Sequence, residues 1–350
     1  MTHTITVHTS SAYDVLCGSG LLPGAGELCR RVNRGVHALI VTDSHVGPLY
    51  ADTVERSLTA AGYQVRTFTF RAGEQSKRLA TVEEIYEQAA MCPLHRDDLI
   101  VALGGGVTGD MAGFAAATWL RGIDVVQIPT SLLAQVDSSI GGKTGVDTVA
   151  GKNLVGAFWQ PRLVISDPDT LDTLPDAVRT EGAAEAIKTA LIADEELFAQ
   201  MEAAGTITPE MIRRCIAVKR DVVEQDEREA GTPKLLNFGH AIGHALERRY
   251  AYRLPHGPAV AVGMVAAARI GRCMGITPAD VEPRIAAVLR RFGLPVEDPV
   301  PPEQLMTFLT ADKKHHASGV DFVLLTRIGS AVWRTVEPAQ LVAWLTPQAD

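Results

Sequence analysis

The sequence lacks several features that would assign it to particular classes of protein. Aromatic residues make up only 5% of the chain. No stretch approaches the roughly 18 consecutive apolar residues of a membrane helix. The opening residues also lack the basic-then-apolar order of a secretory signal peptide. We therefore expect a cytoplasmic protein that does not engage a membrane.

Cysteine and positive charge are both scarce. The five cysteines are scattered and form no CxxC pair, so they predict neither a disulfide framework nor a metal site. Lysine and arginine number 33 against 41 aspartates and glutamates, and the net charge of -8 argues against a broad nucleic-acid surface. A small-molecule ligand suits this composition better.

The chain has enough hydrophobic residues for a large core, and its length suits two domains. Hydrophobic residues make up 46% of the 350 residues, and single cores stop growing at roughly 250–300 residues. In the first part, short apolar runs alternate with helical spacing, as in parallel strands joined by crossover helices. The expected strands there are Thr4–His8, Ala38–Thr42, Val65–Phe70, Leu99–Leu103, Val125–Ile128 and Leu163–Ile165, and the expected helices are Pro48–Ala61, Thr81–Met91 and Asp110–Trp119.

Helical periodicity dominates from about residue 174 onward. We predict an α/β, Rossmann-like domain over residues 1–173 and a mostly α-helical domain over residues 174–350. A short strand is expected at Phe322–Thr326. The predicted helices of the second domain are Thr180–Met201, Pro209–Val223, Lys234–Tyr250, Val260–Met274, Asp280–Phe292 and Glu303–Thr310.

A glycine-rich turn, Gly104–Asp110, follows one predicted strand and leads into a predicted helix. Glycines let the backbone approach a phosphate closely, and the N–H groups at a helix start favour an anion. The turn is neither a GxGxxG fingerprint nor a P-loop, so alone it is also compatible with a tight turn that binds nothing. Asp43 and Glu74 follow other predicted strands, where an acid can accept hydrogen bonds from ribose, although a helix cap or a solvated charge explains each equally well.

Polar anchors gather in the glycine-interrupted stretch Asp137–Lys143 and again at Gly151–Asn153. A lysine in a largely apolar setting suits phosphate or carboxylate binding, because a partly buried ammonium needs an anion beside it. Arg121 is a candidate second cation. Ordinary surface charge is the alternative explanation for all of them.

Histidines cluster between residues 240 and 256. His240 and His244 lie one helical turn apart, and His256 follows a short loop. Upstream, Glu185 precedes Lys188 by three residues on a predicted helix rich in small residues. One glutamate with two histidines is a sufficient ligand set for catalytic zinc, although such histidines also occur in simple helix packing. Spacing does not decide between His240 and His244; we assign the first to the metal and the second to substrate or proton transfer.

These segments together resemble the dehydroquinate synthase family of sugar-phosphate cyclases, over about residues 35–330. The resemblance implies a two-domain, dehydroquinate synthase-like enzyme that works as a homodimer, with NAD and a divalent metal, Zn2+ or Co2+, as cofactors. The similarity is carried by Gly104–Asp110, Ala117–Gly122, Pro129–Thr144, Gly151–Ala157, Ala184–Lys188, Leu236–Glu247, His256–Gly257 and Asp312–Lys314.

The implied reaction converts 3-deoxy-D-arabino-heptulosonate 7-phosphate to 3-dehydroquinate and phosphate, a step of the shikimate pathway to aromatic amino acids. It proceeds by transient oxidation, phosphate elimination, reduction and intramolecular aldol closure. A metal on the secondary alcohol makes hydride loss to NAD easier, and the new ketone acidifies the adjacent C–H. Positioning carries much of the remaining work.

The resemblance also implies a role for particular positions of this chain. The metal ligands would be Glu185, His240 and His256. The substrate phosphate would meet Arg121, Lys143 and Asn153. The reacting part of the substrate would meet Asp137, Lys188, Lys219, Asn237, His244 and Lys313. The cofactor would lie along Asp43, Glu74, Lys77, Gly105, Gly106, Asp110, Thr130, Ser131, Lys143, Lys152, Thr170 and Thr173.

Two positions depart from the family pattern. Pro233 stands where members commonly carry an arginine that helps to hold the substrate carboxylate, and Pro258 stands where many carry a glutamate. Lys234 is a candidate replacement for the missing charge. An unchanged KM in a Lys234→Ala variant would contradict that hypothesis.

Related activities remain open at this stage. An aminodehydroquinate synthase, a sedoheptulose 7-phosphate cyclase and a deoxy-inosose synthase are alternatives, and the last two have no substrate carboxylate to bind, which suits Pro233. Asp110 and Ser139–Lys143 favour the dehydroquinate type. A metal-dependent polyol dehydrogenase would share the fold but accumulate NADH. A binding protein without catalysis would need neither the lysines nor the histidines.

Overall fold

The computed structural model describes residues 2–228, 233–310 and 319–345, with only the backbone at Pro233, Lys234 and Thr310. Lys313 therefore lies outside the described residues, as does the side chain of Lys234. The chain divides into two compact units, one of Met1–Pro175 with Lys219–Arg228 and one of Asp176–Val218 with Glu229–Asp350. The predicted domains, 1–173 and 174–350, contain no such return of the chain.

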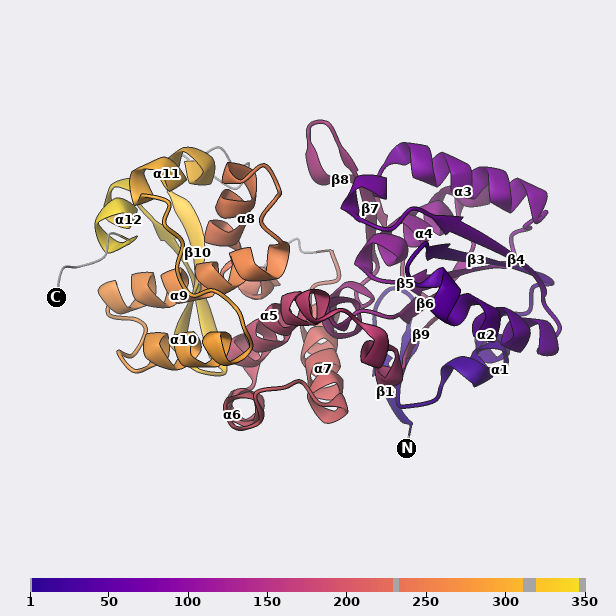
Figure 1. Cartoon of the computed structure of the whole chain (residues 1–350), viewed down its shortest axis with the longest axis horizontal. Coiled ribbons are helices and arrows are strands. Elements are labelled where there is room, and N and C mark those ends of the chain that lie inside the picture. Colours follow the sequence, from indigo (N-terminus) through magenta and orange to yellow (C-terminus); the bar gives the residue numbers. More distant parts are fainter. Residues whose placement is uncertain (1, 229–232, 311–318, 346–350) are drawn as a thin grey trace. The chain divides into compact units, whose positions relative to one another are not determined.

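A seven-stranded sheet is the centre of the first unit (Figure 1). Its order is β1-β2-β9-β6-β5-β3-β4, and every pairing is parallel except that of β1 with β2. This confirms the predicted α/β class. The strands are β1 (His3–Val7), β2 (Tyr13–Cys17), β3 (His37–Asp43), β4 (Gln64–Phe70), β5 (Leu99–Gly104), β6 (Asp124–Pro129) and β9 (Leu163–Ser166).

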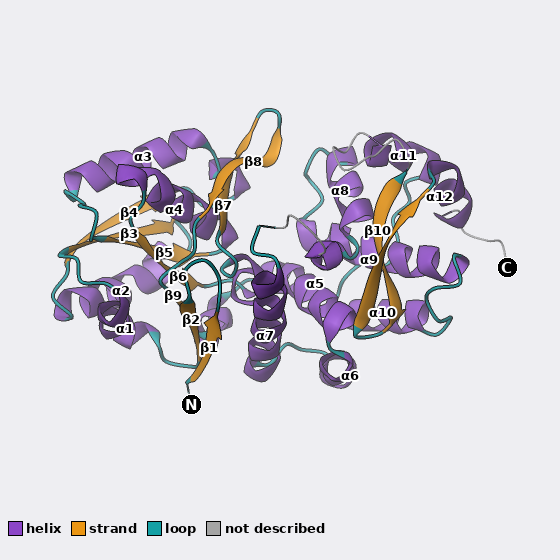
Figure 2. Cartoon of the chain, turned by 180° about the vertical axis from the view of Figure 1, so that it is seen from behind, coloured by secondary structure: helices purple, strands orange, loops and turns teal. Residues whose placement is uncertain are grey.

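Helices cover both faces of this sheet (Figures 1 and 2). α1 (Ala25–Val32) and α2 (Gly47–Ala60) pack on one face, and α3 (Leu79–Met91) and α4 (Gly106–Thr118) pack on the other. Side chains of β5 alternate between the two cores, with Leu99, Val101 and Leu103 in one and Ile100 and Ala102 in the other. A strand buried on both faces is therefore apolar throughout, which is why its run was recognisable in the sequence.

The strand order reverses at β3. The chain passes from β3 to β4 on one side of β3 and then returns to β5 on its other side. The two crossover helices, α2 and α3, therefore lie on opposite faces, and open parallel sheets bind ligands at the carboxyl ends of the strands at such a reversal. Asp43 is the last residue of β3, and the glycine-rich turn begins at the last residue of β5.

A β-hairpin of β7 (Lys143–Thr148) and β8 (Gly151–Phe158) forms a separate small sheet in the first unit (Figure 2). The sequence did not predict it, because its glycines and charges lack a regular alternation. The predictions also omitted β2 and α1. In the region described, no helix combines the length and apolar character of a bilayer-spanning segment.

The second unit is mostly helical, as predicted, with one hairpin packed among its helices (Figure 2). The expected strand Phe322–Thr326 lies within the longer β10, and its partner β11 was not expected. The elements are α5 (Asp176–Ala193), α6 (Glu195–Ala204), the first part of α7 (Pro209–Gln225), α8 (His240–Arg249), α9 (His256–Cys273), α10 (Val281–Arg291), α11 (Pro302–Thr310), β10 (Val320–Arg327), β11 (Ser330–Val336) and α12 (Pro338–Leu345).

Two long predicted helices are each divided. The predicted helix Thr180–Met201 breaks at Asp194, whose carboxylate accepts a hydrogen bond from the backbone N–H of Leu197 and so starts α6. The predicted helix Lys234–Tyr250 is a 3-10 turn, η6 (Pro233–Asn237), followed by α8. Gly239 separates them with a left-handed φ of 80°, a conformation that glycine adopts without strain.

The packing of α1 on α2 gives a direct test of the fold. A Cβ on Gly26 would overlap the backbone carbonyl of Ser57, whereas a Cβ on Gly24 would meet open space. We expect Gly26→Ala to lower the free energy of unfolding by about 1–3 kcal/mol because α1 must move outward. Gly24→Ala, the same added methyl two residues away, should change it by less than about 0.5 kcal/mol. Denaturant unfolding measures both, and equal stability of the two variants would contradict the packing described.

Candidate functional site

Two groups of polar residues stand out, one in each unit. In the first unit, predicted cofactor residues follow the carboxyl ends of neighbouring parallel strands. Asp43 ends β3, Glu74 follows β4, the glycine turn follows β5, and Thr130 follows β6. The sheet therefore brings residues that are far apart in sequence to one edge.

The glycine turn leads directly into α4. Gly105 is its N-cap and provides no side-chain capping bond, and the first turn holds no acidic residue. The helix dipole and the backbone N–H groups at this end therefore favour an anion. The Asp43 carboxylate lies 3.5 Å from the hydroxyl of Thr108 in the same turn. A Cβ on Gly106 would lie 3.0 Å from the Ser138 hydroxyl, and one on Gly105 would lie 3.3 Å from the Ser131 hydroxyl, so bulk at either position would crowd the turn.

Lys77 joins three of the predicted residues. Its side chain is buried, and its ammonium donates to the Asp110 carboxylate at 2.5 Å and to the Asn153 amide oxygen at 2.6 Å. Burial raises the pKa of Asp110 to about 6, although Lys77 acts in the opposite direction. The hairpin and α4 are thereby held together through one lysine.

Three more predicted cofactor residues, Lys152, Thr170 and Thr173, also make polar contacts. Lys152 forms a 3.5 Å ion pair with Glu74. The Thr170 hydroxyl accepts from the Gln135 amide at 3.0 Å, and the Thr173 hydroxyl lies 2.6 Å from the Tyr50 hydroxyl. These contacts tie the loop after β9 to the carboxyl edge of the sheet.

The three predicted phosphate contacts come from separate elements of the first unit. Asn153 bonds to Lys77, near the start of α4, and its own φ is 54°. Arg121 lies beyond the other end of α4, whose 13 residues measure roughly 20 Å. Lys143 begins β7 and is exposed. Because α4 separates Arg121 from the region of Asn153, these contacts do not by themselves show how one phosphate could meet all three residues.

Asp137 and Lys219, 82 residues apart, form an ion pair. The Lys219 side chain is buried, and the segment that carries it belongs to the first unit. Neighbouring bonds hold that segment: Glu224 accepts from the His8 N–H, and Glu227 accepts from Ser10. The sequence suggested both members of the pair but not their contact.

The second unit gathers Glu185, His240 and His256. Glu185 on α5 is 1% exposed, and its Oε1 lies 3.1 Å from His256 Nε2 and 3.4 Å from His240 Nε2. One donor atom from each residue lies within 4.8 Å of the other two. The predicted ligands therefore converge, and two imidazoles with one carboxylate are a donor set that catalytic zinc takes.

Other groups fix the orientation of both imidazoles. The Nδ1 atom of His240 lies 3.1 Å from the Phe238 carbonyl, and the Nδ1 atom of His256 lies 3.5 Å from Glu247 Oε1. A donor N–H at Nδ1 leaves the Nε2 lone pair of each ring directed at Glu185. This is the arrangement of outer hydrogen bonds that supports metal ligands in proteins.

Backbone contact places His256 close to Glu185. A Cβ on Gly257, the next residue, would overlap the backbone of Glu181 on α5, so only glycine permits this approach. The Glu181 carboxylate also accepts from the His256 N–H at 3.2 Å. The small residue after His256 is thus part of the geometry of the site.

Electrostatics of the cluster favour added positive charge. Burial would raise the pKa of Glu185, but Lys188 and His240 outweigh it and hold the pKa well below its usual range. Burial lowers the pKa of His240. Burial would also lower the pKa of His256, but hydrogen bonds to Glu185 and Glu247 raise it to about 10. The two carboxylates thus favour either a proton or a metal cation at His256.

Three further predicted residues lie near this cluster. Lys188, 1% exposed, forms an ion pair with Glu185 Oε2. The His244 ring lies 5.3 Å from that of His240, centroid to centroid, and its Nε2 is 3.9 Å from Glu247 Oε2. Asn237 ends η6, three residues before His240.

Glu247 is the member of this cluster that sequence reasoning missed. It is 4% exposed, and its carboxylate lies 3.9 Å from His244 Nε2 and 3.5 Å from His256 Nδ1. Its position three residues after His244 on one helix face was the available signal. A second donor group of His244, Glu247 and His256 shares one histidine with the first.

Comparison with known families bears on both units. The model of the 3-dehydroquinate synthase N-terminal region matches residues 67–181, and that of the 3-dehydroquinate synthase C-terminal region matches residues 182–315. A 3-dehydroquinate synthase of Geobacter metallireducens is 47% identical over 339 residues, covering 93% of this chain and 94% of the relative. One of Nostoc punctiforme is 44% identical and covers 98% of each chain.

Solved structures agree on the fold. A 2-deoxy-scyllo-inosose synthase complexed with carbaglucose-6-phosphate, NAD+ and Co2+ has a TM-score of 0.88 at 27% identity, covering 98% of this chain and 99% of the other. A 2-epi-5-epi-valiolone synthase of Streptomyces hygroscopicus with NAD+ and Zn2+ bound has a TM-score of 0.87 at 28% identity, covering 97% and 98%. From the family matches over both units and this shared fold, the chain belongs to the 3-dehydroquinate synthase family.

Proposed function

We propose that this chain is a 3-dehydroquinate synthase, which converts 3-deoxy-D-arabino-heptulosonate 7-phosphate to 3-dehydroquinate and phosphate. The observation that carries the proposal is the convergence of Glu185, His240 and His256 in a chain 42–47% identical to relatives of that name. In this proposal the first unit binds NAD and the second binds the metal.

The metal residues fit a divalent cation by their chemistry. Glu185, His240 and His256 would hold Zn2+ or Co2+, which supplies Lewis acidity toward a substrate hydroxyl while NAD supplies a reversible hydride acceptor. The Phe238 carbonyl and Glu247 hold the two imidazoles with Nε2 toward Glu185. Lys188 compensates the second carboxylate oxygen, so the buried Glu185 stays ionised.

We propose that NAD binds along the carboxyl edge of the sheet in the first unit. The start of α4 accommodates its phosphates, since its backbone N–H groups have no side-chain cap. Lys77 holds Asp110 and Asn153 in place by hydrogen bonds. The proposed cofactor residues are Asp43, Glu74, Lys77, Gly105, Gly106, Asp110, Thr130, Ser131, Lys143, Lys152, Thr170 and Thr173.

Substrate groups are assigned by charge. Arg121, Lys143 and Asn153 are proposed to bind the phosphate, which needs cations and amide donors. Asp137 is proposed to act near the reacting hydroxyl, with Lys219 holding its carboxylate in place. His244 is half-buried beside Glu247 and is proposed to carry a proton. Lys188, Asn237 and Lys313 complete the proposed substrate contacts.

Related cyclases and dehydrogenases are less favoured. The cyclases solved with NAD and a metal are 27–28% identical to this chain, whereas the named 3-dehydroquinate synthases reach 42–47%. Glycerol dehydrogenases share the fold at only 15–16% identity, so the likeness does not indicate that this chain catalyses their reaction. The remaining distinction is chemical, since a cyclase regenerates its NAD in each turnover.

We also propose that the enzyme is a cytoplasmic homodimer, as the family resemblance implies. Arg121 gives one reason to examine the assembly, because α4 separates it from the glycine turn within one chain. Sedimentation equilibrium should give the mass of two 37.5 kDa chains. A concentration-independent single-chain mass would contradict the dimer.

Phosphate release tests the proposed reaction. With NAD and Zn2+, the purified chain should release phosphate from the heptulosonate phosphate with no accumulation of NADH. We expect kcat/KM to exceed that for sedoheptulose 7-phosphate by at least about tenfold, because the proposed substrate carries a carboxylate whose partners in the site would be left unpaired by a substrate that lacks one. A chelator should abolish the activity, and Zn2+ or Co2+ should restore it. NADH that accumulates with turnover would instead indicate a dehydrogenase.

Glu247 should act as a positioning residue for His256. We expect Glu247→Gln to weaken Zn2+ binding about 10–100-fold, because His256 loses the partner that orients its ring. Competition with a chromophoric chelator measures the dissociation constant independently of activity. Glu303→Gln, an exposed glutamate on α11, is the matched control and should bind Zn2+ like the unaltered chain. Equal affinity of the two variants would exclude the role.

A further inference from the structure

A second group of two histidines and one carboxylate lies in the first unit, where the proposed function has no use for it. His37 is the first residue of β3, Asp98 directly precedes β5, and His95 lies in the turn between α3 and β5. Because β3 and β5 are parallel neighbours, with Ala38 paired to Leu99, the two strand starts lie side by side. This is the edge of the sheet opposite to the glycine turn.

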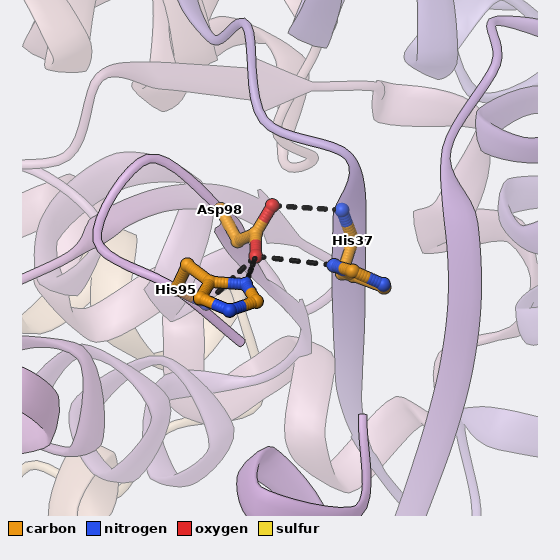
Figure 3. A group of neighbouring side chains, drawn as sticks. All are labelled: His37, His95 and Asp98. Carbon is orange, nitrogen blue, oxygen red and sulfur yellow. Dashed lines mark hydrogen bonds and ion pairs between the residues drawn. The ribbon is translucent and has the colours of Figure 1, made fainter. Parts of the chain in front are cut away.

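The three side chains point toward one another (Figure 3). Asp98 Oδ2 lies 3.2 Å from His37 Nδ1 and 3.5 Å from His95 Nδ1. The three donor atoms all fall within 4.8 Å of each other. In a tetrahedral zinc site with bonds of about 2.0–2.2 Å, neighbouring ligand atoms are roughly 3.3–3.5 Å apart. The spacing observed here is close to that requirement.

The proposed metal site of the second unit provides an internal comparison. There, too, one carboxylate oxygen faces two imidazole nitrogens, with Glu185 Oε1 at 3.1 Å and 3.4 Å from His256 and His240. The two groups thus share their donor types and nearly share their distances. They differ in the nitrogen used, which is Nδ1 for His37 and His95.

Backbone donors hold the Asp98 carboxylate in a fixed orientation. Its Oδ1 accepts from the N–H groups of Val36 at 2.7 Å and His37 at 2.8 Å, and its Oδ2 accepts from the His95 N–H at 2.7 Å. Carboxylates that bind metals are commonly hydrogen-bonded in this way. The second acceptor position of Oδ2 faces His37 Nδ1 at 3.2 Å, where a cation would take the place of the imidazole proton.

The turns that carry the group are also rigid. Asn33 donates to the Asp97 carbonyl at 2.8 Å, and its own oxygen accepts from Gly35 N–H at 2.9 Å. A Cβ on Gly35 would overlap the backbone of Asp97, so the two turns touch at a position that only glycine allows. Metal binding here would need little rearrangement of the backbone.

An ion can reach the three side chains from solvent, because one of them, His95, is exposed. Asp98 is 3% exposed and His37 is 16% exposed, whereas His95 is 77% exposed. Water can therefore complete the coordination from the side of His95. Imidazole with carboxylate suits Zn2+ and Co2+ better than Mg2+ or Ca2+, which prefer oxygen donors.

From this geometry we propose that His37, His95 and Asp98 form a second divalent-cation site, selective for Zn2+ or Co2+ and separate from Glu185, His240 and His256. The ion would join the start of β3 to the turn before β5. Since it binds the folded chain, it would raise the stability of the first unit. The inference does not depend on the proposed function, because none of its three residues takes part in it.

Metal stoichiometry in the full-length chain tests the site. We expect equilibrium dialysis of the chelator-stripped chain against Zn2+ to give two ions per chain, and His95→Ala to bind only one. His3→Ala removes another exposed histidine of the same unit and should still bind two. If His95→Ala and His3→Ala bind the same number of ions, the proposal is wrong. Because the His95 side chain is exposed, we expect the His95→Ala variant to fold normally, and its circular dichroism spectrum should match that of the unaltered chain.

A second measurement isolates the new site. In a His256→Ala background, we expect Co2+ to bind with the visible absorption of tetrahedral coordination and Zn2+ to raise the unfolding temperature. Adding His95→Ala should remove both effects and weaken Zn2+ binding at least about tenfold. Loss of both effects already in His256→Ala alone would contradict an independent site. Phosphate release by the single His95→Ala variant should be unchanged, so failure here is distinct from failure of the proposed function.

Discussion

The second unit depends on one buried negative charge. The Glu185 carboxylate is almost completely removed from water, which would cost several kcal/mol if it stood alone. Lys188 faces one of its oxygens, and His240 and His256 face the other. Lys188 lies on α5 with Glu185, whereas His240 and His256 come from α8 and α9, so the compensation is complete only when the three helices are assembled. Glycines at the helix contacts, such as Gly257, make that assembly close enough.

The first unit solves a different problem, which is to bring scattered polar residues to one edge. Parallel pairing does this, since β3, β4, β5, β6 and β9 all end on the same side of the sheet. Asp43, Glu74 and the glycine turn lie at that edge because each is at, or a few residues after, the end of a strand. Lys77, Asp110 and Asn153 lock the hairpin to it. Fixed hydrogen bonds of this kind pre-organise a site before a ligand arrives.

Sequence reasoning reached the fold class and pointed to residues whose side chains the structure brings together, Glu185, His240 and His256, because both have local signals. Buried strands such as Leu99–Leu103 are continuous apolar runs, and His240 and His244 have helical spacing. Irregular features escaped it: the hairpin of β7 and β8 lacks alternation, and Asp194 divides a helix through a single capping bond. The pairing of Asp137 with Lys219 and the place of Glu247 depend on tertiary contacts, which spacing does not encode. The cluster of His37, His95 and Asp98 is equally invisible in one dimension, because β3 and β5 are separated by a whole β-strand and two helices.

The return of Lys219–Arg228 to the first unit bears on how the chain reaches its native state. A ribosome delivers residues in order, so the α/β core can collapse once residue 175 has emerged, yet it still lacks the partner of Asp137. That partner arrives only after α5, α6 and the first half of α7 have been made. Completion of the first unit therefore waits until residues 176–218 of the second unit have been made, although most of the second unit is still to be synthesised.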